Sequence, residues 1–554
     1  MKKLIYIILG SIFSIVNSSC SLDETIFDQA TATNAVRSEA DLDYAVVGAY
    51  SNLNSANLFG RDIMYIINPY ADDISSTVSF EPGTFGRKVD VNSGTAFFNN
   101  VYVRFYETIR EAHALLRYVN QVTTSDFNKE KVKGEAYFLR AFCYFNLVQL
   151  WGGVPLITET VDAKSDFYQP RASVDEVYAL IFSDLEAAAK SLYTRTAQPA
   201  SEFYRATKGA AQGYLAKAYL TYANYLDLNN RSSESKNYYQ KAKEAAEEVI
   251  SSGQYSLVTD YSALWDVEKE KSNYIEVIFA IPHTRDAANL TVTGEGSFFP
   301  AHFLPPSLAG TTGTTTTAGL DYLKIQPWFF EKYTKDDWAG DYRVETTFLS
   351  SWIGSNGVRR RAYPLSFLTS DTKSSYAYLA KYKDGKGLSN FGHENDHYLL
   401  RLSEIYLIKA EAENEINGPT SEALDAFNKL RERARKADGN ARMVPADVSS
   451  GLSKEDFRMK IFDERGLEFI GEYHRFFDLI RMRCKDNKRT MYEYQFATFI
   501  PSLPAGVPTA SGTKWVGGVT QPLTLPPYNS KFLLFPIPAN QMGNNPKLVQ
   551  NPGW

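Results

Sequence analysis

Aromatic side chains stand beside amides and carboxylates in two parts of the sequence. The first part comprises residues 65–73 and 97–102, which combine Tyr and Phe with Asn68, Asp72, Asn99 and Asn100. The second part holds three of the seven tryptophans outside any strong helical pattern: Trp328, Trp338 and Trp352. Sugar rings present C–H faces that pack against aromatic rings, while Asn, Asp and Arg bond the hydroxyls. Asp72 and the three tryptophans are therefore candidate ligand contacts, with simple packing as the alternative for each.

No residues show the spacing of a familiar metal or nucleophile site. The six histidines include no HExxH or other metal-ligand spacing. His393 and His397 lie four positions apart, but Gly392 and Asn395 beside them indicate the entrance of a helix rather than a ligand-bearing helix. No serine elbow, phosphate loop or dinucleotide fingerprint occurs. The sequence predicts neither a metal nor a cofactor.

The adjacent carboxylates Asp72 and Asp73 could in principle serve a glycosidase, which needs two carboxyls across the scissile bond. Side chains of adjacent residues usually point apart, and a sequence does not give their separation. A local turn or capping role is the stronger interpretation. We therefore predict that the protein is not an enzyme.

The first twenty residues predict export. Lys2 and Lys3 precede an apolar run from Leu4 to Val16, and small residues follow at 17–19, which is typical of a secretory signal peptide. Cys20 comes directly after them, and this arrangement resembles a bacterial lipoprotein signal, in which that cysteine is acylated. Asn17 stands where such signals usually have Leu. The expectation is a signal peptide at 1–19 and a lipidated tether at 20–30, with ordinary secretion as the alternative.

Composition narrows the class of protein. Of 554 residues, 44% are hydrophobic and 22% charged, and no second long apolar segment follows Val16, so no further spanning helix is expected. Removal of Lys2 and Lys3 with the signal changes the net charge from −5 to −7, which gives no basic stripe for nucleic acid. The chain has three cysteines, and Cys143 lies in an apolar stripe that predicts a small core residue.

The spacing of apolar residues predicts a helical scaffold. Residues 134–151 are apolar nearly all round and should form a central helix, while 38–54 should form an amphipathic one. Two helix pairs alternate small and aromatic residues as tetratricopeptide repeats do: 207–226 with 235–252, and 397–416 with 420–436. Between the pairs, residues 255–392 predict loops and short strands such as 276–281. Residues 310–319 and 501–529 predict irregular segments.

Two sets of charged residues favour structural roles. The segment 464–481 has charges at spacings that predict pairs along one helix, with Phe462, Phe469 and Phe476 on its core side. Arg140 stands alone in an apolar helix and predicts a buried, paired framework residue.

Several long blocks, in order, resemble the SusD/RagB family of nutrient-binding outer-membrane lipoproteins. The most specific blocks are GEAYFLRAFCYFNLVQLWGGVPLI at 134–157, LLRLSEIYLIKAEAENE from Leu399, IFDERGLEFIGEYHRFFDLIR from Ile461 and the terminal LLFPIPANQMGNNPKLVQNPGW. The resemblance covers essentially the whole mature chain. It implies a mainly α-helical fold, in which tetratricopeptide-like helix pairs support a loop-rich half. In this family an aromatic residue and an Asn just before a helix commonly reach the ligand, which implies Phe97, Phe98 and Asn100 here.

The resemblance also implies a function. A lipoprotein held by Cys20 on the cell surface would bind an oligosaccharide and pass it to a SusC-like TonB-dependent transporter, with the helical scaffold facing that transporter. We expect an N-terminal helical region at 31–254 and a C-terminal region at 255–554 within one compact unit. A peptide-binding protein with the same transporter arrangement and a protein-interaction scaffold are the alternatives.

Overall fold

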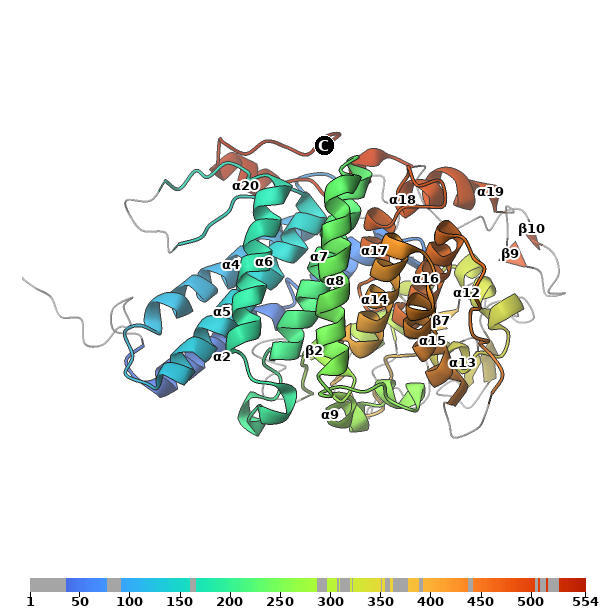
Figure 1. The fold of residues 1–554 in the computed structure, drawn as a ribbon, viewed down its shortest axis with the longest axis horizontal. Coiled ribbons are helices and arrows are strands. Elements are labelled where there is room, and N and C mark those ends of the chain that lie inside the picture. Colours follow the sequence, from blue (N-terminus) through green and yellow to red (C-terminus); the bar gives the residue numbers. More distant parts are fainter. Residues whose placement is uncertain are drawn as a thin grey trace, which may run out of the picture.

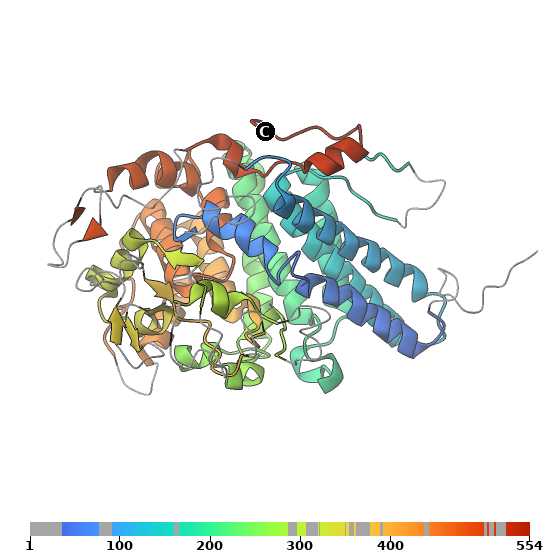
Figure 2. The same cartoon turned by 180° about the vertical axis from the view of Figure 1, so that it is seen from behind.

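The computed structural model is shown from opposite sides in Figures 1 and 2. Cys20, the predicted signal peptide and the predicted tether lie outside the described residues, as does most of the run 310–319. The structure describes residues 36–76, 91–159, 166–285, 296–305, 308, 319–320, 322–349, 351–353, 359–361, 377–387, 392–436, 442–503, 507–508, 515–516 and 528–554.

The described residues form a mainly α-helical fold with short strands, which confirms the predicted fold class. The helices are α2 (Glu39–Asn54), α3 (Asp62–Ile67), α4 (Ala96–Tyr118), α5 (Asp126–Trp151), α6 (Val174–Ser191), α7 (Lys208–Leu228), α8 (Ser232–Ser251), α9 (Glu270–Asn273), α11 (Phe299–Phe303), α12 (Pro327–Thr334), α13 (Tyr342–Thr347), α14 (Leu402–Asn417), α15 (Ser421–Lys436), α16 (Lys454–Phe469), α17 (Arg475–Arg481), α18 (Met491–Tyr494), α19 (Ile500–Ser502) and α20 (Ala539–Asn544). The strands are β1 (Ile74–Ser76), β2 (Val277–Ile281), β3 (Leu323–Ile325), β4 (Phe348–Leu349), β5 (Ser351–Ile353), β6 (Arg359–Arg361), β7 (Tyr378–Leu379), β8 (His397–Arg401), β9 (Val507–Pro508) and β10 (Trp515–Val516). They pair antiparallel as β1–β3, β2–β8, β4–β7, β5–β6 and β9–β10.

The longest helices stand side by side as one layer (Figure 1). α4 packs against α5, α5 against α6, α6 against α7 and α7 against α8, and α14 continues the row beside α8. The predicted pair 207–226 with 235–252 is confirmed as α7 with α8. The short strands and connecting segments between β2 and α14 gather on the opposite side (Figure 2). The helical layer therefore forms a support for the loop-rich half.

α5 is almost completely buried between its neighbours in the helical layer, as predicted for a helix that is apolar nearly all round. Nearly all of its residues from Gly134 to Trp151 are buried, including Cys143, whose thiol is free. Gly152 ends the helix with a φ of +74°, a conformation that a residue with a side chain rarely adopts. Arg140 donates to both carboxylate oxygens of Asp184 at 2.7 and 2.8 Å, so its predicted framework role is confirmed.

Residues 397–416, predicted as one helix, begin as a strand. β8 pairs with β2, which confirms the predicted strand at 276–281, and α14 begins at Leu402. A short apolar run fits a strand and a helix equally well, and here pairing with a distant strand decides the outcome. His397 lies in β8, where its ring stacks on Phe299 at 3.6 Å between centroids.

The charged segment 464–481 forms two helices, α16 and α17, and its charges pair mainly with other elements. Within this described segment, Asp478 and Arg481 alone pair along a helix, so the predicted ladder of pairs is wrong. Arg401 at the end of β8 donates instead to Glu276, Glu468 and Glu472, with N···O distances of 2.6–3.0 Å. These four side chains are at most 1% exposed. We call them the Arg401 charge cluster.

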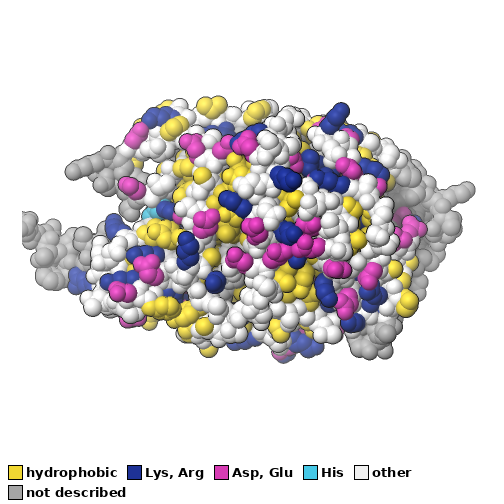
Figure 3. All heavy atoms as spheres, viewed as in Figure 1, with side chains coloured by type: hydrophobic (Ala, Val, Ile, Leu, Met, Phe, Trp, Pro, Cys, Tyr) yellow, Lys and Arg dark blue, Asp and Glu magenta, His cyan; other side chains and the backbone are white. Residues whose placement is uncertain are grey.

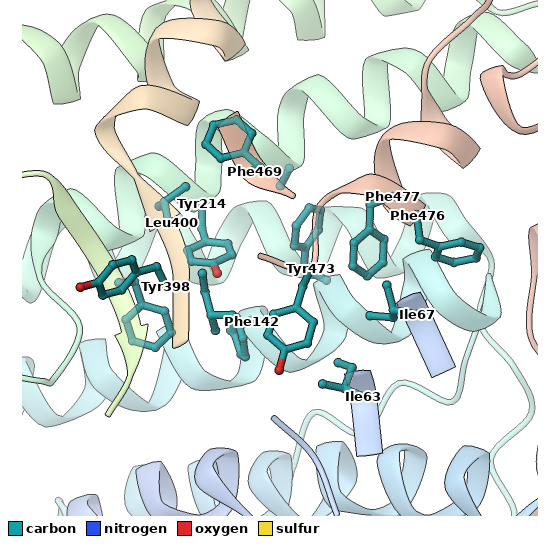
Figure 4. Close-up of a cluster of buried hydrophobic side chains, with 14 of the residues drawn as sticks. Ile63, Ile67, Phe142, Tyr214, Tyr398, Leu400, Phe469, Tyr473, Phe476 and Phe477 are labelled. Atoms are coloured by element: carbon teal, nitrogen blue, oxygen red, sulfur yellow. The ribbon is translucent and has the colours of Figure 1, made fainter. Parts of the chain in front are cut away.

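The hydrophobic core runs through both halves of the chain. Figure 4 shows Ile63 and Ile67 of α3 and Phe142 of α5 facing Tyr473 and Phe477 from the C-terminal region. All belong to one continuous cluster of buried side chains. The regions 31–254 and 255–554 therefore share a core.

The C-terminal segment packs against α4 and α5. The indole nitrogen of Trp151 donates to the Pro536 carbonyl at 2.9 Å, across 385 positions of sequence. Asn551 donates back to the Trp151 carbonyl at 3.0 Å. The Trp554 ring lies edge-on to Phe98, with 6.4 Å between centroids. The end of α5 and the inner face of α4 are thus covered by residues 536–554.

Surface properties give two further facts. The helical face in Figure 3 carries acidic and basic side chains interspersed, in agreement with the mild net charge. Within the described part of the chain, no helix combines the length and the apolarity needed to cross a membrane.

Replacing Glu135 of α5 with Gln should stabilise the protein more at pH 8 than at pH 5. Burial raises the pKa of Glu135 to about 7, against the attraction of Arg205 and Lys131. Between pH 4.5 and 7 the carboxyl is therefore protonated in the folded state and ionised in the unfolded state. Its contribution to stability is complete below the unfolded pKa and is lost as the pH rises through 7.

The free energies of unfolding of wild type and Glu135→Gln, measured by denaturant titration at both pH values, test this prediction. The difference in free energy of unfolding between Glu135→Gln and wild type should increase, in favour of the variant, by on the order of 3 kcal/mol from pH 5 to pH 8. A difference that does not change with pH would contradict it.

Candidate functional site

The candidate site lies where α3 and the first turns of α4 meet the segment that contains α11. α4 begins at Ala96, before the residues that were expected to precede a helix. Phe97, Phe98 and Asn100 therefore lie in a helix and not in a loop before it. Successive helical residues point about 100° apart, so Phe97 and Phe98 contact different neighbours.

Five aromatic rings gather at this end of α4. Tyr65 of α3 lies edge-on to Phe97, with 5.4 Å between centroids, and to His302 of α11, with 5.3 Å. His302 also contacts Tyr322 at 5.1 Å and Phe298 at 5.9 Å. Edge-on and offset contacts of this kind hold rings in defined orientations. We call Tyr65, Phe97, Phe298, His302 and Tyr322 the aromatic cluster.

Two hydrogen bonds hold the His302 ring in place and define which of its nitrogens carries the proton. Its Nδ1 donates to the Phe298 carbonyl at 2.6 Å, so its Nε2 accepts from the Tyr65 hydroxyl. Burial, aided by the charge of Arg61, lowers the pKa of His302 to about 4. The imidazole is therefore uncharged at neutral pH and holds the Tyr65 ring in place.

Polar groups adjoin the aromatic cluster. The guanidinium carbon of Arg61 lies 5.9 Å from the Phe298 ring centroid, and its Nε donates to Asp62 at 2.7 Å. Asn100 donates to the other oxygen of Asp62 at 2.9 Å. Burial raises the pKa of Asp62, and Arg61 and Asn100 oppose this effect. Arg61 keeps 32% of its side chain exposed, and Asn100 and Tyr322 are half-buried, so donors and acceptors remain accessible beside the rings.

Asp72 and Trp328 meet, but inside the protein. Asp72 is fully buried and accepts from Arg475 of α17 at 2.6 and 2.9 Å, so the predicted local turn or capping role is wrong. Trp328 is 6% exposed, and its indole nitrogen donates to the Asp72 carbonyl at 3.0 Å. Asp72 and Trp328 thus connect segments that are far apart in the sequence. These contacts lie inside the protein, so both side chains are buried.

The remaining predicted contacts also pack in the core. Phe98 is fully buried against Phe535, at 5.0 Å between ring centroids. Trp338 lies edge-on to Tyr333, and Trp352 lies edge-on to Tyr378 in a separate small cluster. Trp338 and Trp352 are each 7% exposed. We retain Phe97 and Asn100 of the predicted contacts as parts of a site, because Phe97 contacts Tyr65 in the aromatic cluster and Asn100 bonds Asp62 beside it.

Three members of the aromatic cluster were not predicted. Phe298, His302 and Tyr322 lie in the stretch 255–392, which was interpreted only as loops and short strands. The signal that would have found Phe298 and His302 is the density of rings in FFPAHF at 298–303, where three Phe flank a His.

The arrangement is suited to noncovalent recognition. It combines the half-buried ring of Tyr322, supported by four buried rings, with an amide and a guanidinium, and such groups fix the orientation of a bound ligand. Among the residues that the structure describes, no group of three or more His, Cys, Asp or Glu is placed to hold a metal ion.

Known protein families match both halves of the chain. The model of the SusD family matches residues 276–554, and a family described as "Starch-binding associating with outer membrane" matches residues 22–220. The chain therefore belongs to the SusD family, as its sequence blocks predicted.

Individual relatives agree with this assignment. SusD-like protein P2 of Formosa agariphila is 29% identical over 504 residues, which cover 87% of this chain and 91% of the relative. SusD-like protein P25 of the same organism is 26% identical over 557 residues, which cover 93% of this chain and 92% of the relative.

Solved structures share the fold. A SusD homologue from Bacteroides thetaiotaomicron has a TM-score of 0.77 at 20% identity, covering 94% of this chain and 98% of the other. A laminarin-binding SusD-like protein has a TM-score of 0.67 at 22% identity, covering 94% and 100%. Surface glycan-binding protein A from Bacteroides uniformis has a TM-score of 0.63 at 21% identity, covering 93% and 99%.

Proposed function

We propose that this protein is a cell-surface lipoprotein of the outer membrane that binds an oligosaccharide without chemically changing it. The aromatic cluster, with Arg61 and Asn100 beside it, carries this proposal. Rings that pack against sugar faces and side chains that bond hydroxyls are both present there. Two proteins of the same fold, a laminarin-binding SusD-like protein and a surface glycan-binding protein, support the same class of ligand. Because Tyr322 is the one half-buried ring of the aromatic cluster, we expect micromolar to millimolar affinity.

In the proposed arrangement, acylated Cys20 holds the protein to the outer membrane and a SusC-like TonB-dependent transporter receives the glycan. The helical layer is the proposed transporter-facing side, since the aromatic cluster involves α11 and Tyr322 from the loop-rich half. Apolar side chains lie between charged ones down the middle of the helical face (Figure 3), as in a surface that meets a protein partner.

Replacing Tyr322 with Ala should weaken oligosaccharide binding about tenfold. Loss of one stacking ring removes roughly 1.4 kcal/mol, which corresponds to a factor of ten in the dissociation constant. Isothermal titration with oligosaccharides of starch and laminarin, within a wider glycan panel, measures the effect. Tyr44→Ala is the matched control, because Tyr44 lies on α2 with 75% of its surface exposed and should not affect binding.

A parallel panel of peptides decides between the two ligand classes. Glycan binding that falls in Tyr322→Ala and persists in Tyr44→Ala supports the proposal. Clear peptide binding without any glycan binding would replace it with a peptide-capture function. The absence of binding in both panels would favour an interaction scaffold.

A further inference from the structure

A cavity lies beside the later turns of α4. It has a volume of about 450 Å³ and is bounded by residues 106–118 of α4 and by residues 157–159. Ligand pockets in proteins commonly have volumes of about 300–1,000 Å³, so the cavity suits a ligand of one or two rings. At ~1.5 Å per residue, Arg117 lies about 25 Å along the helix from Asn100 of the candidate site.

Arg117 lines this cavity as a cation without a countercharge. Among the described residues no carboxylate lies within 4.0 Å of its guanidinium, and its Nε is buried without a hydrogen-bond partner. The guanidinium carbon lies 5.0 Å from the Tyr118 ring centroid. Half-buried arginines are normally paired with carboxylates, since burial of an unpaired charge is costly. The Arg117 guanidinium is therefore available to bind an anion.

The neighbouring charges do not balance Arg117. Arg110 donates to Glu111 through Nε at 3.2 Å and Nη2 at 2.8 Å, so these two neutralise one another. His113 is uncharged, because burial and the nearby Arg140 lower its pKa to about 4. Glu159 is exposed and forms no ion pair within the described residues, and it is the group that would oppose an anionic ligand.

A tyrosine side chain lines the cavity together with Arg117. Tyr118 lines the same cavity and is half-buried, and its ring centroid lies 5.0 Å from the guanidinium carbon of Arg117. A planar guanidinium binds carboxylates and sulfates through two parallel hydrogen bonds, and a tyrosine ring beside it offers a surface for a sugar.

We propose that this cavity binds a saccharide unit that carries a carboxylate or a sulfate. Its anionic group pairs with Arg117 and its ring packs against Tyr118. This inference rests on the proposed glycan-binding function and specifies an acidic class of glycan. It concerns a position separate from the aromatic cluster.

Titrations of the protein with four single-ring or smaller probes test the proposal: glucuronate, glucose 6-sulfate, glucose and inorganic sulfate. Ligand-observed NMR detects binding in the millimolar range. We expect the two acidic sugars to bind at least tenfold more tightly than glucose and than inorganic sulfate. Arg117→Gln should weaken acidic-sugar binding about tenfold, and Glu159→Gln should strengthen it about twofold.

Two controls accompany these variants. Arg117→Lys keeps the positive charge in the last turn of α4, where any cation favours the helix dipole, but removes the paired hydrogen bonds, so it should lose several-fold affinity. Lys236→Gln removes an exposed cation from α8 and should have no effect. Circular dichroism confirms that each variant is folded.

Equal binding of glucose and the acidic sugars would overturn the proposal, as would wild-type affinity in Arg117→Gln or a lack of binding by either acidic sugar. Equal binding of inorganic sulfate and glucose 6-sulfate would also overturn it, because the site would then bind an anion and not a sugar. The neutral-glycan panel and Tyr322→Ala report separately on the aromatic cluster, so failure here is distinguishable from failure of the proposed function.

Discussion

Replacing Arg401 with Met should lower the free energy of unfolding by about 3–5 kcal/mol, because it leaves buried carboxylates without their shared cation. Arg401 donates to Glu276, Glu468 and Glu472, and all four side chains are almost fully covered. Burial alone would raise the pKa of Glu468, yet Arg433, Arg401 and Arg343 together hold it well below its usual range. Removal of one member of the Arg401 charge cluster therefore leaves the other buried charges unbalanced.

Met is chosen because it has similar length and fills the space without charge. The matched control is Arg231→Met, since Arg231 pairs with Asp175 at 2.8 Å but keeps 32% of its side chain exposed. Exposed pairs contribute roughly 0–1 kcal/mol. Denaturant titration of the three proteins gives the comparison. Equal losses in the two variants would show that burial of the cluster has no special role in stability.

Cells that produce the Cys20→Ala protein should lose nearly all of it from the membrane fraction. The proposed anchor consists of acyl chains on Cys20, and each buried methylene contributes ~0.8 kcal/mol to membrane attachment. The described residues contain no helix able to span a membrane and replace the anchor. Fractionation followed by immunoblotting measures the distribution, in a strain without the transporter so that protein–protein attachment does not contribute.

The control for this experiment is Thr25→Ala, which changes the same predicted tether but keeps the cysteine. It should remain with the membrane. Metabolic labelling with a palmitate analogue provides a second readout, because wild type and Thr25→Ala should be labelled and Cys20→Ala should not. A Cys20→Ala protein that stays membrane-bound would rule out the lipid anchor.

Much of the fold could be predicted from local sequence. α5 was recognisable because residues 134–151 are apolar on every side, and α7 with α8 because small and aromatic residues alternate at helical spacing. The strand β8 was missed because a run of five residues does not distinguish a strand from a helix, and its partner β2 lies more than a hundred positions away. Local sequence patterns predict the long helices, but pairing with a distant segment decides whether a short apolar run forms a strand or a helix.

The site was harder to predict, since its contacts join distant segments. Tyr65 and His302 are separated by 237 positions, and nothing in the spacing of either residue indicates the other. Asp72 was misinterpreted for the same reason, because its partner Arg475 is 403 positions away. Tryptophan density was a poor guide as well: Trp328, Trp338 and Trp352 lie close in sequence, but each packs against a different ring.

The packing of residues 536–554 on α4 and α5 sets the order in which the molecule can assemble. During synthesis α4 and α5 leave the ribosome nearly 400 residues before Pro536 and Asn551, which bond to Trp151. Until then the ring of Phe98 lacks Phe535 and Trp554 as neighbours. The first helices therefore complete their packing only after the rest of the chain has been made. In the proposed export of the protein, this delay would keep the first helices incompletely packed and suited to translocation as an extended strand.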